Sequence, residues 1–245
     1  MSKNRDHDYL YINEKKYLTD PKYTTTQFEN LLKEISFGKK QESLWDIGCS
    51  NGSLLNYLVK KFPNSKLYGS DVIKESLEVA KKNTHSSIEY FFDDITKEKT
   101  LSLECDVLIS VGVFQIYEEI EKILNQYISR VKPKGYIFIQ GPLNKYGVDV
   151  LIKYRDNRNT KTEEIDQIGW NLWSVEYLEN LFDKIKEIEN YEFIPIHFPK
   201  DLTVEHDHKD TLRSWTVNLD GENKFLNGLF LQDHYFIKLK IDKSS

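Results

Sequence analysis

Short apolar runs alternate with amphipathic stretches through the first 140 residues of the chain. The runs are rich in aliphatic and aromatic side chains, as strands are, and the stretches carry apolar residues at helical spacing. The predicted strands are residues 44–47, 66–71, 88–92, 106–111 and 136–140. The predicted helices are residues 53–62, 73–83 and 116–131. This alternation predicts a parallel, doubly wound α/β sheet whose strand carboxyl ends share one edge.

Outside this region the pattern is less regular. A helix is predicted to start at Thr24–Thr26, which would cap it, and to end near Gly38. After Gly141 the chain becomes polar. A helix over residues 174–188, capped by Ser174, and strands over residues 192–198 and 229–239 are predicted there. Residues 199–228 are predicted to form one long loop, and long loops in compact domains are often functional.

Composition narrows the class of protein. A chain of 245 residues with 39% hydrophobic content can bury one sizeable core. The net charge is −5 and no basic stripe is present, so a nucleic-acid partner is not expected. The chain has no apolar run long enough to span a membrane. Its start is polar, and its two cysteines, Cys49 and Cys105, form no framework of disulfides. We expect a cytoplasmic protein, monomeric or homodimeric.

The stretch from Leu44 to Leu55, LWDIGCSNGSLL, joins the first predicted strand to the first predicted helix through a turn with two glycines. Such a turn lets backbone approach a ligand closely and points free helix N–H groups at it. A phosphate-binding P-loop would need a lysine after Gly52, where Ser53 stands. A dinucleotide fingerprint would need glycines in place of Ser50 and Ser53. Both of these sites are therefore disfavoured.

The same stretch resembles the first motif of class I S-adenosylmethionine-dependent methyltransferases, an acid followed by two spaced glycines. Here these are Asp46, Gly48 and Gly52, and Ser50 stands where many members carry a third glycine. The resemblance implies a Rossmann-like sheet of seven strands, mostly parallel with an antiparallel last strand. It also implies one domain, residues 1–245. Its parts are an N-terminal helical lid (1–40), a cofactor-binding core (41–140) and acceptor-binding insertions with the final strands (141–245).

The ends of the predicted strands supply the contacts to S-adenosylmethionine. Asp71 ends the second strand, where a carboxylate can accept hydrogen bonds from both hydroxyls of a ribose. The resemblance implies that Asp94 receives the adenine amino group, with Asp93 as the alternative, and that Ile95 lines the base. It places Asp46 near the methionine ammonium. The predicted cofactor-binding residues are Asp46, Gly48, Cys49, Ser50, Gly52, Asp71, Val72, Asp94, Ile95, Ser110 and Val111.

The sequence indicates the methyl acceptor less clearly than it indicates the cofactor. Methyl transfer needs an aligned nucleophile, and a hydroxyl nucleophile also needs a base. The candidate catalytic residues are His197, Gln115, Tyr117 and Arg213. Arg213 stands beside Trp215, and such a pair could grip an acidic or sugar-like group. His234 falls within a strand, where a packing role is expected.

No metal is expected, although His197, His206 and His208 cluster in the sequence, because their spacing matches no metal signature. The polar and aromatic insertions favour a small polar acceptor, most of all a hydroxyl of a sugar or nucleotide-linked sugar, as in bacterial sugar O-methyltransferases. A carboxylate of a small polyacid is the close alternative, followed by an amine. A protein that binds S-adenosylmethionine without catalysis is the non-enzyme alternative. S-adenosylhomocysteine would be the product of the cofactor.

Overall fold

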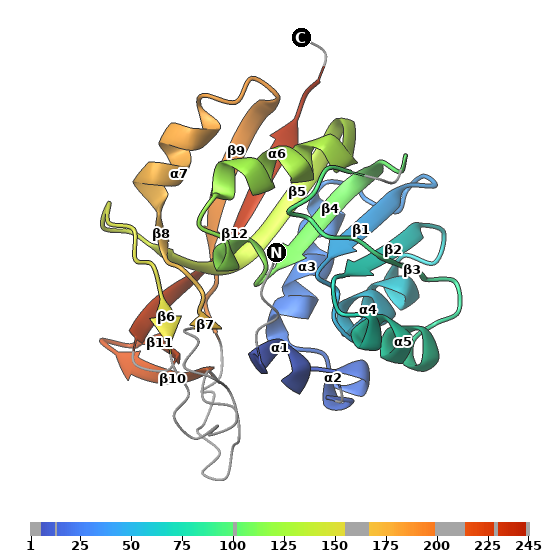
Figure 1. The fold of residues 1–245 in the computed structure, drawn as a ribbon, viewed down its shortest axis with the longest axis horizontal. Helices are drawn as coiled ribbons and strands as arrows, with labels where there is room; N and C mark the ends of the chain where they lie inside the picture. Colours follow the sequence, from blue (N-terminus) through green and yellow to red (C-terminus); the bar gives the residue numbers. More distant parts are fainter. Residues whose placement is uncertain are drawn as a thin grey trace.

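The structure is a computed structural model that describes residues 6–12, 14–99, 102–154, 167–198, 214–227 and 230–243. Its centre is a twisted sheet in which seven strands lie in the order β3-β2-β1-β4-β5-β12-β9 (Figure 1). β12 runs antiparallel to both of its neighbours, β5 and β9, and the first five strands are parallel. The predicted doubly wound, Rossmann-like sheet with an antiparallel last strand is therefore confirmed. The seven strands are β1 (Ser43–Ile47), β2 (Lys66–Asp71), β3 (Glu89–Phe92), β4 (Cys105–Val111), β5 (Val131–Asn144), β9 (Ile188–Pro195) and β12 (Phe230–Ile241).

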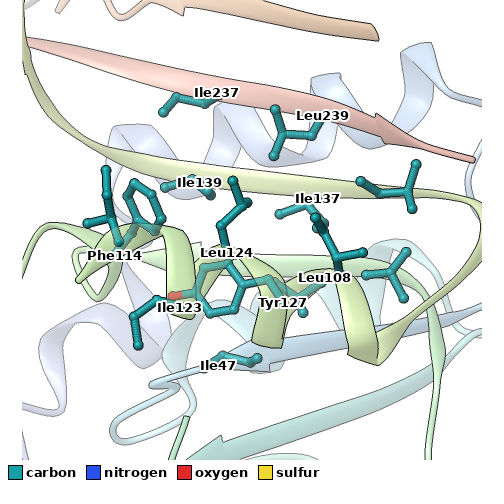
Figure 2. Close-up of a cluster of buried hydrophobic side chains, with 14 of the residues drawn as sticks. Ile47, Leu108, Phe114, Ile123, Leu124, Tyr127, Ile137, Ile139, Ile237 and Leu239 are labelled. Carbon is teal, nitrogen blue, oxygen red and sulfur yellow. The ribbon is translucent and has the colours of Figure 1, made fainter. Parts of the chain in front are cut away.

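Helices cover both faces of this sheet (Figure 1). One face carries α3 (Tyr23–Glu34), α4 (Ser53–Lys61) and α5 (Lys74–Asn83), and the other carries α6 (Ile120–Arg130) and α7 (Val175–Phe182). Figure 2 shows how Leu124 and Tyr127 of α6 pack on isoleucines of β5 and on Leu108 of β4. Each helix contributes an apolar stripe to a face of the sheet, which is why the sequence alternates as it does.

Several predicted boundaries were wrong. The helix predicted from residue 116 begins at Ile120, because residues 114–116 form a separate 3₁₀ turn, η1 (Phe114–Ile116). The helix predicted to reach residue 188 ends at Phe182, and Ile188 already belongs to β9. Ser174 caps α7 as predicted, accepting a hydrogen bond from the backbone of Tyr177. No threonine caps α3, since its N-cap is Lys22 and makes no side-chain bond.

The predicted long loop, residues 199–228, was also wrong in part. Within it lies a hairpin of β10 (Ser214–Leu219) and β11 (Glu222–Asn227), and β11 also pairs with β12. Its turn holds Asp220 and Gly221, both with positive φ (52° and 86°). An Asp-Gly pair between strands is a strong hairpin signal, because both residues tolerate the left-handed backbone of a tight turn. The sequence therefore contained the information that predicts this hairpin.

The remaining short elements gather beside the carboxyl edge of the sheet. α1 (Asp6–Leu10) and α2 (Lys16–Thr19) lie below the strand ends in Figure 1, on the side that also carries β6, β7 and the β10–β11 hairpin. β6 (Lys153–Tyr154) pairs with β7 (Gln167–Ile168), and β8 (Trp173–Ser174) extends β5. Among the helices that the structure describes, none is long and apolar enough to cross a membrane.

Candidate functional site

The glycine turn after β1 is held by the end of β2. The backbone N–H groups of Gly48 and Cys49 both donate to the carbonyl of Ser70, at 2.8 and 3.0 Å. The N–H of Ser50 donates to Oδ2 of Asp71 at 2.9 Å. Gly48, Ser50 and Gly52 have φ of 73°, 48° and 75°, so the turn passes through the left-handed region three times before α4 begins. The first helical N–H groups are thus presented at the carboxyl edge of the sheet.

The two glycines of this turn also have no room for a side chain. A Cβ on Gly48 would lie 2.3 Å from a methyl carbon of Val113, and one on Gly52 would lie 2.3 Å from the hydroxyl of Tyr90. Together with their positive φ, these contacts explain why the positions are glycine. Cys49 is buried and its thiol pKa is raised well above the usual value by that burial, so its sulfur is a neutral packing atom.

Two buried carboxylates stand side by side at this turn. Asp46 is buried, with 3% of its surface exposed. Burial raises its pKa well above the usual value, and the nearby charge of Asp71 raises it further. Burial also raises the pKa of Asp71, although backbone N–H groups of Ile73 and Ser50 oppose this. A bound cation beside Asp46 would relieve this unfavourable burial, so the pair fits the ammonium and ribose of S-adenosylmethionine.

The two acids of the loop after β3 have different hydrogen-bond partners. Asp93 receives a bidentate pair of hydrogen bonds from Arg130, at 3.1 and 3.0 Å, and both side chains are buried. Asp94 accepts hydrogen bonds from Thr96 and an ion pair from Lys97. Burial would raise its pKa, but these contacts together lower it, so Asp94 is an anion at the edge of the site. Of the two acids, Asp94 has the freer position, which agrees with its predicted contact to adenine.

The other predicted cofactor-binding residues take three kinds of position. Ile95 is buried and Val72 is half-buried, both directly after the acids that end their strands. Val111 is the most exposed of the set, at 36%, and lies at the rim. Ser110 is fully buried, and its hydroxyl lies 2.8 Å from that of Tyr127 on α6. The side chain of Ser110 therefore belongs to the core, and only its backbone is left for the cofactor.

An asparagine of the glycine turn holds the N-terminal segment. The side-chain amide of Asn51 donates to the carbonyls of Tyr11 and Glu14, at 3.0 and 2.9 Å. Asn56, one turn into α4, donates to the carbonyl of Leu18. α1 and α2 are thereby tied to the turn that would hold the cofactor. Sequence reasoning missed Asn51, because nothing in the turn itself shows that a segment forty residues earlier needs hydrogen bonds.

The insertion after β5 folds back onto the loop that follows β4. The indole N–H of Trp170 donates to the carbonyl of Gly112 at 2.8 Å. Asn171 bonds the backbone of Gln115 through its N–H, and that of Tyr117 through its side chain. Its side-chain oxygen accepts from the N–H of Ile152. Asn171 is 1% exposed and joins the three segments into one wall.

Three of the four predicted catalytic residues lie in the described part of the chain. Gln115 is fully buried under Gly141, and neither atom of its amide has a hydrogen-bond partner in the described structure. Tyr117 is half-buried and contributes its backbone carbonyl to the wall. His197 is exposed just beyond β9. Arg213 lies outside the described residues, so these four roles stay predictions.

Of His206, His208 and His234, only His234 lies in the described part of the structure. His206 and His208 lie outside the described residues, and no cluster of three metal-ligating side chains occurs within the described part. His234 of β12 faces Gln140 of β5, with Nδ1 3.2 Å from the amide nitrogen. Its pKa is lowered to about 4 by burial. The sequence placed His234 in a strand but gave no sign of this pair.

Comparison with known proteins agrees with this geometry. Residues 45–137 match the model of a methyltransferase domain family. The segment runs from the strand before the glycine turn to β5. This match agrees with the resemblance to methyltransferases that the sequence motifs carry.

Curated relatives match beyond this segment at lower identity. A malonyl-[acyl-carrier protein] O-methyltransferase of Halalkalibacterium halodurans is 30% identical over 120 residues, 47% of this chain and 43% of the relative. A protein of the same name from Acetivibrio thermocellus is 24% identical over 72% of this chain and 62% of the relative. The pavine N-methyltransferase of Thalictrum flavum subsp. glaucum is 21% identical over 82% and 52%. The chain spans about half the length of such relatives.

Solved structures share the fold at still lower identity. A phosphoethanolamine-type N-methyltransferase of Haemonchus contortus, solved with S-adenosylhomocysteine, aligns with a TM-score of 0.62 at 13% identity, over 95% of this chain and 57% of that one. The plantazolicin methyltransferase BpumL, also with S-adenosylhomocysteine, aligns at 0.55 and 16% identity, over 96% and 89%. The fold is thus that of class I methyltransferases along almost the whole chain.

Proposed function

We propose that this chain is an S-adenosylmethionine-dependent methyltransferase. The observation that carries the proposal is the buried carboxylate of Asp46, close to the charge of Asp71 at a turn with three left-handed residues. Asp46 would hold the methionine ammonium, Asp71 the ribose, and Asp94 with Ile95 the adenine. When bound, S-adenosylmethionine supplies a methyl group on a positively charged sulfur. The residues of this chain fix that methyl group in position and keep water from it.

We propose that the methyl group is accepted by an oxygen atom of a small molecule, or of a small group bound to a carrier. A carboxylate oxygen is the first candidate, and a hydroxyl oxygen is the second. Six curated relatives of this chain, including the two described above, are malonyl-[acyl-carrier protein] O-methyltransferases. That name describes methylation of a carboxylate oxygen. A carboxylate is already deprotonated at neutral pH and needs no base to act as the nucleophile. The sugar hydroxyl predicted from the sequence has no comparable support.

The test is a turnover assay with purified protein. S-adenosylmethionine is incubated with a malonyl thioester, a free sugar, a nucleotide sugar or a primary amine, and release of S-adenosylhomocysteine is followed. We expect turnover with the malonyl thioester and a product ester seen by mass spectrometry. Turnover with a sugar alone would restore the hydroxyl acceptor. Binding of S-adenosylmethionine without turnover on any class of acceptor would make the chain a binding module and refute the enzyme.

A further inference from the structure

The hydrogen-bonded pair of Gln140 and His234 lies at the carboxyl edge of the sheet. Gln140 is aligned with Val111, the last residue of β4. His234 stands opposite Pro142 near the start of β12. Gln140 is 7% exposed, and Nε2 of His234 is buried with no hydrogen-bond partner in the described structure. An unpartnered ring nitrogen in a buried position is costly unless a ligand completes it.

The register of the sheet puts this pair on the same face as Asp46. Asp46 is aligned with Ile109, and Ile109 with Phe138. Residues two apart in a strand face the same side, so Gln140 and Pro142 share the face of Phe138. His234, opposite Pro142, shares it as well. β1 and β12 are three strand spacings apart in the sheet order, about 14 Å. The pair therefore lies across the rim from the carboxylate that would hold the ammonium.

Aromatic side chains from three segments enclose the pair. The ring of Phe225, on β11, lies 4.2 Å from that of His234 between centroids. Phe198, just after β9, lies 4.2 Å from Phe225, and Tyr23 at the start of α3 lies 5.4 Å from Phe198. The His234 ring therefore lies against apolar side chains, and its Nε2 is buried. In such surroundings a hydrogen bond to a charged oxygen is strengthened.

The partner of Nδ1 fixes which ring nitrogen carries the proton. The amide nitrogen of Gln140 faces Nδ1, so the amide donates and Nδ1 accepts. Burial keeps the ring neutral at neutral pH, since it lowers the pKa of His234 to about 4. Nε2 then bears the single proton. It can donate to an acceptor oxygen, but it cannot remove a proton from a hydroxyl.

Resting on the proposed methyltransferase function, we propose that His234 binds the acceptor, with its Nε2–H donating to one oxygen of a carboxylate while Gln140 fixes the ring. The other carboxylate oxygen forms a bond to the methyl carbon as the methyl–sulfur bond breaks. The bonding pair stays on sulfur, and no proton moves. Because Phe225 packs on the ring, the β10–β11 hairpin controls entry of the acceptor. The pair thus selects carboxylates over hydroxyls.

Steady-state kinetics of His234→Phe test this, with the malonyl thioester of N-acetylcysteamine as acceptor. The phenyl ring keeps the packing and removes the donor. We expect kcat/KM for the acceptor to fall about 10- to 100-fold, as for a lost hydrogen bond to a charged group, with the affinity for S-adenosylmethionine unchanged. His85→Phe, at an exposed histidine in the turn after α5, is the matched control. Equal kinetics of the two variants would overturn the proposal while leaving the methyltransferase intact.

Nitrogen NMR of the wild-type protein supplies a second test that needs no variant to be active. Histidine is labelled with ¹⁵N, and the His234 signals are assigned from their loss in His234→Phe or, if that variant does not fold, in His234→Gln. We expect a protonated Nε2, a bare Nδ1, and a shift of Nε2 when the malonyl thioester is added with S-adenosylhomocysteine. A proton on Nδ1, or no shift, would overturn the proposal even if no acceptor is turned over.

Discussion

Burial of the Asp46 carboxylate destabilises the fold, and the same carboxylate is proposed to bind the cofactor. Its carboxylate is buried and faces a second carboxylate, so its pKa is raised well above the usual value. A carboxyl whose pKa is higher in the folded than in the unfolded state binds more protons when folded. Its contribution to stability is therefore lost as the pH rises through that range. The same ionisation creates the negative charge that a methionine ammonium needs.

Asp46→Asn should accordingly separate stability from affinity. The neutral amide removes the buried charge, so we expect a higher melting temperature than wild type at pH 8 in the absence of cofactor, and about tenfold weaker binding of S-adenosylmethionine. Scanning calorimetry and titration calorimetry measure the two effects. In wild type, affinity should also fall as the pH is lowered through the raised pKa of Asp46. A variant that keeps this pH dependence would contradict the role given to Asp46.

At the residue scale, the sequence predicted residues for the proposed cofactor contacts and did not predict the Gln140–His234 pair. Asp46, Asp71 and Asp94 were predicted because strand ends can be read locally, and parallel strands bring their carboxyl ends to one edge. Gln140 and His234 are 94 positions apart, and only the register between β5 and β12 pairs them. Nothing local to either residue encodes that register, so the pair could not be predicted.

At the scale of elements, Asn51 connects the glycine turn to α1 and α2. Its buried side chain donates two partly buried hydrogen bonds to backbone carbonyls of the N-terminal segment. If that segment covers the cofactor, as the predicted lid implies, these bonds couple closure of the segment to the shape of the turn.

Asn51→Ala should loosen this coupling. Loss of these two hydrogen bonds is expected to destabilise the fold by about 1–3 kcal/mol and to speed dissociation of S-adenosylmethionine about tenfold. Stopped-flow displacement and limited proteolysis within residues 6–22 are the measurements. Asn64→Ala, at an exposed turn between α4 and β2, is the matched control and should change neither. If both variants release the cofactor at the wild-type rate, the segment is no lid.

The elements themselves were predicted unevenly, for physical reasons. The five strands and three helices before residue 141 carry strong period-2 or period-3.6 patterns, because each buries one face or stripe in the core. Among the residues of the β10–β11 hairpin whose burial is described, Phe225 is buried and Leu219 is 44% exposed, so the apolar alternation is weak. Its Asp220-Gly221 turn indicates a hairpin, but residues 199–228 were predicted to form a loop.

At the scale of the whole molecule, the sheet order places the proposed cofactor contact and the proposed acceptor contact at one rim. β1, β4, β5 and β12 are neighbours, and their adjoining ends carry Asp46, Val111, Gln140 and His234 in that spatial order. The fold thus offers a continuous path from the ammonium contact to the acceptor contact. The wall built by Asn171 and the segment tied by Asn51 flank this rim.

The central claim is that this rim binds S-adenosylmethionine. Titration calorimetry of the wild-type chain with S-adenosylmethionine, NAD and ATP tests it most directly. We predict one site for S-adenosylmethionine in the micromolar range and no binding of NAD or ATP, because the turn lacks both the P-loop lysine and the dinucleotide glycines. Absence of heat with S-adenosylmethionine, or tighter binding of NAD, would contradict the account.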